Sequence, residues 1–397
     1  MTTASEARSV RARHVSDVDV VRVLTFAAVI AVHTVSQTNS DTSVAANAAV
    51  MLLHFTREAF FCLTGFVLAH QYLDRRIDLP AFWRRRFVLV GAPYLVWTVL
   101  YSGLQWVQGS RTMSFAAWLR LTWRYAYTGT AWFHMYFLLV SMQIYLLYPL
   151  IAALVRATRR HHAALLTVSA LVQLSMATLL HYTAAGRSWT GTADVVVLAY
   201  QFYVLLGAVA ADHLDQCAAW LRRHRRLPVA VLLLCGLGTL AWYLVSVARG
   251  TLASDAAAVW QPVMVPWSIA AVCGLAVLGS VWAQHRRPGQ PLERILRVGS
   301  DRSFGVYLVH PAVLWLVLWT GGHWLGRHLD SAALTAVAYL LTVAGAIAVT
   351  EAFRRSPLSL AVTGRPRRRR TQTPNQAQTT GPEVTNHAFD CPDLARA

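Results

Sequence analysis

Two ionisable residues, Arg22 and His33, stand eleven positions apart in one apolar stretch near the start of the chain. Eleven helical residues turn through about 1100°, roughly 20° from three full turns, so both side chains lie on one helix face about 16 Å apart along the axis. A guanidinium suits phosphate, and an imidazole can take a proton from a hydroxyl. The pair therefore indicates either anion binding and base chemistry on one helix, or two side chains that extend to opposite headgroup layers.

A second apolar stretch contains His54, Arg57 and Glu58. His54 and Glu58 are four residues apart and share a helix face, so the carboxylate could fix the imidazole tautomer and raise its basicity. Arg57 and Glu58 are neighbours whose side chains diverge by about 100°, which predicts partners on other helices. A catalytic pair and a buried charge pair that holds helices together are both open at this point.

Two later apolar stretches also carry polar side chains. His134 and Tyr136 begin one of them, on the side of the membrane predicted for His33, where they would either bind substrate or anchor the helix at the interface. His310 precedes Pro311, and a proline frees a backbone carbonyl, which favours a polar side chain nearby. Ionisable groups inside apolar stretches are costly, so each of these residues is a functional candidate.

The elements that must position these residues are hydrophobic helices. Of the 397 residues 56% are hydrophobic and 14% are charged, and the mean hydropathy is +0.41. A bilayer core ~30 Å thick needs about 20 helical residues to cross it, and the apolar runs have about this length. The sequence predicts an all-α, polytopic transmembrane bundle of about ten spans, at 18–37, 47–73, 87–107, 131–155, 163–182, 193–213, 227–248, 262–283, 303–321 and 331–352.

The distribution of the arginines predicts how these spans are oriented in the membrane. All 36 basic residues are arginine, and with a cytoplasmic N-terminus 28 of them fall in inner segments and six in outer segments, leaving Arg22 and Arg57 within spans. Such an alternating excess is what the positive-inside rule predicts, with both termini cytoplasmic. Arg22 is then near the inner surface and His33 near the outer one. The positive charges that give the chain its net charge of +18 thus lie where membrane topology predicts them, and we expect no nucleic-acid partner.

The chain is expected to divide into a cytoplasmic N-terminal arm at 1–17, a transmembrane domain at 18–352 and a disordered basic cytoplasmic tail at 353–397. From Gly364 onward the tail has no periodic apolar pattern and is expected to be disordered near the inner leaflet. The longest outer connection, 108–130, is aromatic. It is either an interfacial aromatic belt or a short amphipathic segment that helps bind a sugar-like acceptor by ring stacking.

The sequence lacks the motifs that mark several kinds of functional site. The lack of lysine excludes a Walker phosphate loop and a Schiff-base lysine. The five cysteines are scattered and show no zinc spacing or disulfide framework. His161 and His162 lie in a basic inner loop, where solvation is the expected state. We therefore predict no metal site and no bound cofactor.

Five short motifs in this order resemble the membrane acyltransferase-3 family, whose members O-acylate sugars, lipopolysaccharide, peptidoglycan and antibiotics. The resemblance covers most of residues 17–320. The motifs are Arg22 with His33; Phe60 to Phe66, with Thr64 in the place of a serine; Phe82 to Arg86 followed by Pro93 and Tyr94; Trp132 to Pro149; and Ser303 to His310. The sequence departs from the family at Leu89, where an arginine often stands, and it has no fused outer hydrolase-like domain.

The resemblance implies an O-acyltransferase in the cell membrane, and the arginine-only basic usage indicates a GC-rich bacterial source. The donor would be cytoplasmic acyl-coenzyme A, in particular acetyl-coenzyme A, and the acceptor a sugar, glycan or small-molecule hydroxyl. His33 is expected to act as general base, with Glu58 or His54 assisting it. Substrate-binding roles are expected for Arg22, Arg57, Arg84, Arg85, Arg86, His134, Tyr136 and His310.

An alternative of another class is an exporter of a glycan or lipid-linked sugar, with Arg22, Arg57 and Glu58 lining its path. Transporters often show internal repeats and broken helices, and the sequence shows no such repeat. A purely structural membrane protein would not explain so many ionisable groups within spans. Besides these substrates, the expected partners are membrane lipids.

Overall fold

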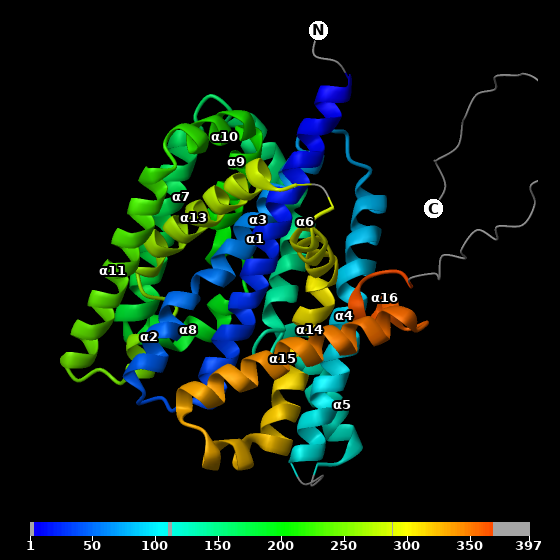
Figure 1. Cartoon of the computed structure of the whole chain (residues 1–397), viewed down its shortest axis with the longest axis vertical. Coiled ribbons are helices and arrows are strands. Elements are labelled where there is room, and N and C mark those ends of the chain that lie inside the picture. Colours follow the sequence, from blue (N-terminus) through cyan, green and yellow to red (C-terminus); the bar gives the residue numbers. More distant parts are fainter. Residues whose placement is uncertain (1–3, 110–112, 288, 368–397) are drawn as a thin grey trace, which may run out of the picture. The chain divides into compact units, whose positions relative to one another are not determined.

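A computed structural model of the chain describes residues 4–109, 113–287 and 289–367 (Figure 1). These residues form helices and contain no strand, which confirms the all-α prediction. The first helices are α1 (Ala4–Thr38), α2 (Val44–Leu53), α3 (Phe55–Tyr72), α4 (Leu79–Gln108), α5 (Phe115–Thr128), α6 (Tyr136–Ala157), α7 (His162–Tyr182) and α8 (Ala184–Asp194). They are followed by η1 (Val197–Tyr200), α9 (Gln201–Asp212), α10 (Leu214–Arg223), α11 (Arg226–Ala248), α12 (Ala253–Ala256), α13 (Met264–His285), α14 (Pro291–His328), α15 (Ser331–Arg355) and α16 (Ser359–Thr363).

Nine helical segments of the described residues are long and apolar enough to cross a membrane. They are α1 from Asp19 onward, α2 with α3, and each of α4, α6, α7, α11, α13, α14 and α15, and they coincide with nine of the ten predicted spans. The sixth predicted span, 193–213, is broken. Here α8 and the η1–α9 segment meet at a bend of 95°, and ten spans are reached only if this bent pair counts as one.

The side chain of Gln143 on α6 satisfies the backbone at this bend. Its Nε2 donates to the carbonyl of Val195 at 2.7 Å, and its Oε1 accepts the N–H of Val197 at 2.9 Å. Within a bilayer an unpaired backbone group costs several kcal/mol, so a break in a helix needs such a partner. Hydropathy does not register this interaction, and the sequence therefore predicted a continuous span.

A second interruption lies in α6, where Pro149 cannot donate to the carbonyl of Tyr145. The indole Nε1–H of Trp83 on α4 donates to that carbonyl instead, at 3.0 Å. Trp83 and Pro149 belong to two of the short motifs singled out in the sequence. Their pairing gives those motifs a physical reason, because one residue frees a carbonyl and the other satisfies it.

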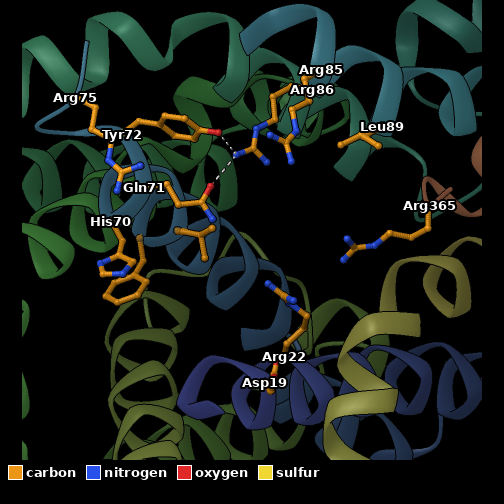
Figure 2. Close-up of a pocket in the computed structure, with 12 residues that line it drawn as sticks. Asp19, Arg22, His70, Gln71, Tyr72, Arg75, Arg85, Arg86, Leu89 and Arg365 are labelled. Carbon is orange, nitrogen blue, oxygen red and sulfur yellow. Dashed lines mark hydrogen bonds between the residues drawn. The ribbon is translucent and has the colours of Figure 1, made fainter. Parts of the chain in front are cut away.

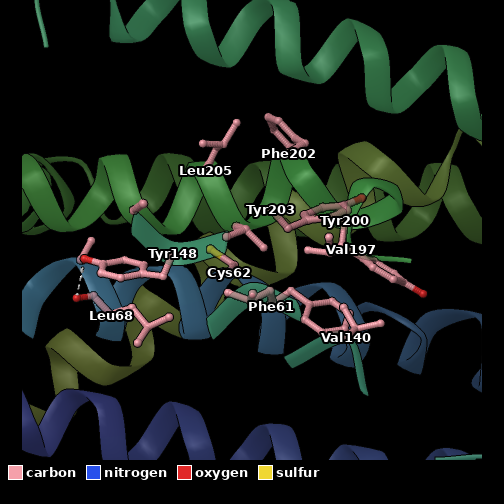
Figure 3. Packing of buried hydrophobic residues seen from close by; sticks show 14 of the residues in the cluster. Phe61, Cys62, Leu68, Val140, Tyr148, Val197, Tyr200, Phe202, Tyr203 and Leu205 are labelled. Carbon is pink, nitrogen blue, oxygen red and sulfur yellow. Dashed lines mark hydrogen bonds between the residues drawn. The ribbon is translucent and has the colours of Figure 1, made fainter. Parts of the chain in front are cut away.

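Helices α3 and α9 pack closely enough for their backbones to touch (Figure 3). A Cβ on Gly65 would lie 2.2 Å from the carbonyl oxygen of Val204, and one on Gly207 would lie 1.9 Å from that of Cys62. Only glycine fits at either position. Small residues permit this kind of close approach between membrane helices, where van der Waals packing is a main attraction.

The segment after α15 differs from the predicted tail. We expected irregular chain from residue 353, but α15 continues to Arg355 and α16 follows it. Val362 and Thr363 of α16 are buried, and the Nε1–H of Trp97 donates to the carbonyl of Val362 at 2.9 Å. Residues 368–397 lie outside the described residues, and for them the disordered tail stays a prediction.

The connection at 108–130, which the sequence predicts to be on the outer side, contains the helix α5. Its N-terminus is capped by Ser114, whose hydroxyl accepts the N–H of Ala117 at 3.3 Å. Every fourth residue along one face is apolar and exposed: Phe115, Leu119, Trp123 and Tyr127. An amphipathic helix with such a stripe suits the membrane interface, which favours the aromatic-belt interpretation.

The contact between α3 and α9 can be tested with alanine. Gly207→Ala places a methyl group against the carbonyl of Cys62, and the overlap should cost about 1–3 kcal/mol of stability. Gly238→Ala on α11 is the matched control, since nothing lies within 4 Å of its Cβ position. Thermal unfolding in detergent should show a lower midpoint for Gly207→Ala alone. Equal midpoints for both variants would contradict the close contact.

Candidate functional site

A cavity of about 610 Å³ lies among α1, α3, α4 and Arg365, which follows α16. Five arginines line it together with a single carboxylate, Asp19; the arginines are Arg22, Arg75, Arg85, Arg86 and Arg365. Figure 2 shows Arg22 from α1, Arg85 and Arg86 from α4, and Arg365 from the segment after α16 pointing toward one common space. Ligand pockets in proteins typically have volumes of roughly 300–1,000 Å³. The excess of guanidinium groups suits an anionic ligand with several phosphate oxygens.

Arg22 is oriented within the cavity by a hydroxyl. Its Nη1 donates to the Oγ of Ser300 at 3.2 Å, and that Oγ donates to the Oδ1 of Asp19 at 2.5 Å. The guanidinium is therefore held in place without a direct bond to the carboxylate. Because Arg22 lines a cavity together with four other arginines and bonds to Ser300, its position favours anion binding over extension to the headgroup layer.

The three arginines that the sequence placed in an inner loop lie on α4, and only two of them reach the cavity. Arg85 and Arg86 line it, whereas Arg84 does not. Arg86 donates from Nη2 to the Oε1 of Gln71 at 3.1 Å and to the hydroxyl of Tyr72 at 3.5 Å. Arg75 and Arg365 were not predicted, since nothing in the sequence distinguishes them from the other arginines of the inner loop and the tail.

Three of the predicted histidines meet at a second place. The ring of His310 on α14 lies 5.5 Å from that of His33 on α1 and 5.4 Å from that of His134, which immediately precedes α6. The ring of Phe133 lies 4.2 Å from His33. We call His33, His134 and His310 the histidine cluster. It brings together residues from the first, fourth and ninth predicted spans.

The tautomer of His310 follows from Pro311. The proline frees the carbonyl of Tyr307, and the Nδ1 of His310 lies 2.7 Å from that oxygen. A carbonyl only accepts, so Nδ1 carries the proton and Nε2 of the neutral ring presents a lone pair. This confirms the predicted link between Pro311 and the polar residue before it.

Four buried polar atoms of this region have no partner of hydrogen-bonding geometry among the described residues. They are the Nε1 of Trp132, both ring nitrogens of His134 and the Nε2 of His310. The ring of Tyr101 lies between two of these residues, 4.9 Å from Trp132 and 5.3 Å from His134. Leaving one such group unpaired costs about 1–3 kcal/mol. A cluster of them is what a bound polar ligand would satisfy.

Aromatic side chains lie between the cavity and the histidine cluster. Phe26 follows Arg22 by four residues and precedes His33 by seven, on the same face of α1. Its ring lies 4.6 Å from Phe60 and 5.7 Å from Tyr307. We call Phe26, Phe60 and Tyr307 the aromatic layer. None of the cluster histidines lines the arginine cavity.

Arg57 and Glu58 form a separate charged group. The Nε and Nη2 of Arg57 donate to the Oε1 of Glu58 at 3.0 and 2.9 Å, and its Nη1 donates to the Oδ1 of Asp194 at 3.1 Å. The guanidinium also lies over the rings of Trp260 and Tyr200, at 4.5 and 5.0 Å. The prediction that the neighbouring side chains diverge is wrong, because the long arginine side chain folds back. The partner on another element is Asp194, at the bend.

His54 and Tyr136, the other predicted site residues of this region, lie near the charged group of Arg57 and Glu58. Glu58 makes no hydrogen bond to His54, which lies at the break between α2 and α3, where continuous helical spacing is lost. Tyr136 lies within electrostatic range of Arg57, beside the charged group. Neither Arg57 nor Tyr136 lines the arginine cavity. The geometry thus favours a buried charge pair over a catalytic His54–Glu58 pair.

One group of side chains among the described residues is of the kind that could bind a metal ion. Ligand atoms of His162, Asp212 and His213 lie within 4.8 Å of one another. Asp212, however, accepts two hydrogen bonds from Arg159, at 2.9 and 3.2 Å, and Nδ1 of His162 lies 2.9 Å from Nε2 of His213. These groups therefore satisfy each other. His162, which we expected to be solvated, is buried.

A family model described as an acyltransferase domain matches residues 15–351 of the chain. The match includes Arg22, Arg85, Arg86 and the histidine cluster, and it ends before α16. No curated protein and no solved structure matches the chain.

The structural assignment of Glu58 can be tested by unfolding. Glu58→Gln removes a partner from a buried guanidinium, and breaking such a pair should cost about 3–5 kcal/mol. Asp74→Asn is the matched control, because its pair with Arg159 is exposed and worth about 0–1 kcal/mol. Thermal unfolding should show a large loss for Glu58→Gln only. A Glu58→Gln protein of wild-type stability that has lost activity would assign Glu58 a catalytic role instead.

Proposed function

The chain belongs to the acyltransferase-3 family, and from that premise we propose that it is an integral membrane O-acyltransferase. It transfers an acyl group, in the first instance acetyl, from cytoplasmic acyl-coenzyme A to a hydroxyl of a sugar, glycan or small molecule. One observation carries the proposal: His33 of the histidine cluster, whose neighbours carry unpaired polar atoms, lies on the same face of α1 as Arg22, which lines a cavity rich in guanidinium groups.

The arginine cavity is the proposed donor site. Coenzyme A carries a pyrophosphate and a 3′-phosphate, and arginine forks bind phosphate oxygens through paired N–H donors. The arginine distribution along the chain supports a cytoplasmic position for this cavity. From Arg22 to His33 the helix rises about 16 Å, which is of the same order as an extended pantetheine arm.

The histidine cluster is the proposed site of transfer. His33 takes the proton of the acceptor hydroxyl, and the oxygen attacks the thioester carbonyl carbon. The carbon–sulfur bond then breaks, and the coenzyme A thiolate leaves with the proton from the His33 imidazolium. The lone pair on Nε2 of His310 accepts a hydrogen bond from an acceptor hydroxyl, and the Nε1–H of Trp132 is a donor for a substrate oxygen. A relay through acyl-His33 uses the same residues and is distinguished by label trapped on the protein.

The aromatic layer has a role in this scheme. It occupies the space between the two sites, so the pantetheine arm must displace or pass the rings of Phe26, Phe60 and Tyr307. In the absence of donor these rings separate the cavity from the histidine cluster. Excluding water from the cluster protects the thioester from hydrolysis and strengthens polar interactions there.

Export of a glycan is the second candidate function, and the bent pair of α8 and η1–α9 favours it, because broken helices are common in transporters. Arg57, which would line the export path, is however paired with two carboxylates. Purified protein given labelled acetyl-coenzyme A and a mixture of candidate glycans distinguishes the two functions. Transfer of label supports the transferase. Movement of unmodified glycan across vesicles without transfer supports the exporter.

His33→Gln and Arg22→Ala should impair different steps, the transfer itself and the binding of the donor. His33→Gln removes the proposed base and should lower the transfer rate by about 10²–10⁴-fold while leaving donor affinity unchanged. Arg22→Ala removes a charged hydrogen bond to phosphate and should weaken donor binding about tenfold to a hundredfold. The control is Arg76→Ala, an exposed arginine that does not line the cavity.

The measurements are initial rates at varied acetyl-coenzyme A and direct binding of the donor, on protein shown to be folded by thermal unfolding. A normal rate for His33→Gln would remove His33 from the mechanism. An unchanged donor affinity for Arg22→Ala would remove Arg22 from the donor site.

A further inference from the structure

The wall of the arginine cavity is completed by a segment that the family match does not include. Residues 359–365, which follow α15 and contain α16, lie beyond residue 351, where that match ends. Their last residue, Arg365, lines the cavity. We infer that Arg365 is a donor-binding residue, whose guanidinium contacts a phosphate of coenzyme A. The inference rests on the proposed function and names a residue from outside the family domain that determines donor recognition.

The segment is fixed to the bundle by specific contacts. The Nε1–H of Trp97 on α4 donates to the carbonyl of Val362 at 2.9 Å, and both residues are buried. The hydroxyl of Ser359 donates to the carbonyl of Arg365 at 2.8 Å and closes the turn. These bonds hold the backbone of Arg365 in a defined place, so its side chain is presented to the cavity and is not part of a loose tail.

Gly364 sets the direction of the chain before Arg365. Its φ is +62°, in the left-handed region that side chains disfavour. A Cβ on it would lie 2.4 Å from the carbonyl oxygen of Leu89 and 2.6 Å from Cε1 of Phe304. Pro93 frees that same carbonyl of Leu89 from its helical hydrogen bond, so the segment packs where α4 is interrupted. Both the backbone conformation and the close approach therefore require glycine here.

The guanidinium of Arg365 faces other positive charges. Figure 2 shows it extending into the space bounded by Arg22, Arg85 and Arg86. Arg22 and Arg365 are within electrostatic range of each other, and their mutual effect is repulsive. No carboxylate of the described residues pairs with Arg365, and Asp19, the one carboxylate lining the cavity, is bonded to Ser300. Like charges that converge on one space are stabilised when an anion binds between them.

The wall beside Arg365 explains why this residue is needed. On α4 the adjacent lining residue is Leu89, which has no charge to offer. Arg85 and Arg86 lie toward the N-terminal end of the same helix, about one turn before Leu89. Arg365 therefore supplies the positive charge on this side of the cavity.

The test is donor binding by the full chain in lipid nanodiscs, measured calorimetrically with acetyl-coenzyme A. Arg365→Ala should weaken binding about tenfold or more, since a hydrogen bond to a charged group is lost, and Arg365→Lys should restore part of the affinity. Arg367→Ala is the matched control, because this nearby arginine bonds to the carbonyl of Arg355 and does not line the cavity. Gly364→Ala should weaken binding as well, since it displaces the segment while leaving the guanidinium intact.

Truncated donors show which part of coenzyme A is contacted. With acetyl-pantetheine, which lacks all the phosphates, Arg365→Ala and wild type should transfer at equal rates. A loss toward acetyl-coenzyme A but not toward its dephospho form assigns the contact to the 3′-phosphate, and an equal loss toward both assigns it to the pyrophosphate. Either result supports the inference.

Two results would overturn the inference. One is wild-type affinity of Arg365→Ala for acetyl-coenzyme A, and the other is an equal loss of rate with acetyl-pantetheine, which would show a merely structural role. Failure of the wild-type protein itself to bind acetyl-coenzyme A is a different outcome. That result would contradict the proposed function and not the position of Arg365.

Discussion

A bilayer contains no water to satisfy polar groups, so each polar group within the spans must find its partner in the protein. The fold meets this constraint at three places where its helices are interrupted. Gln143 bonds both backbone groups at the bend after α8. Trp83 donates to the carbonyl that Pro149 frees, and His310 donates to the one that Pro311 frees. The first two pairings join segments far apart in the sequence and fix α6 against the bend and against α4, whereas the third lies within α14.

Because of this constraint, buried polar groups that have no partner in the protein indicate where a ligand could bind. Around His33 four polar atoms, on Trp132, His134 and His310, are buried close together without hydrogen-bond partners among the described residues. In the arginine cavity, positive charges converge with a single carboxylate among them. Under the proposed function, a hydroxyl-bearing acceptor would bind at the histidine cluster and a phosphate-bearing donor would bind among the arginines of the cavity. The aromatic layer lies between them, as a thioester that must be kept from water would require.

Much of this could be predicted from the sequence, for physical reasons. Spans follow from runs of apolar residues, and a shared face for Arg22 and His33 follows from helical spacing, so these features need no tertiary information. The bend after α8 was missed because hydropathy ignores the single glutamine that makes it possible. The pairing of Arg57 with its neighbour Glu58 was missed because angular spacing ignores the reach of a long side chain.

The residues of the arginine cavity show most clearly what the sequence alone could not predict. Arg84 and Arg85 are indistinguishable in sequence, and only the helix rotation decides which one faces the cavity. Arg365 stands in a polar, arginine-rich stretch with no apolar periodicity. Its position depends on Gly364 and on bonds from Trp97 and Ser359, which only the folded chain brings together.

The central claim is that donor and acceptor approach from opposite sides of one helix bundle, and sidedness tests it most directly. The protein is reconstituted in sealed vesicles of defined orientation, established by labelling a cysteine introduced at Arg76. Labelled acetyl-coenzyme A is then supplied on one side only, with acceptor on the other. The account predicts transfer only when the donor is on the side of residue 76. Transfer only when the donor is on the opposite side would contradict it.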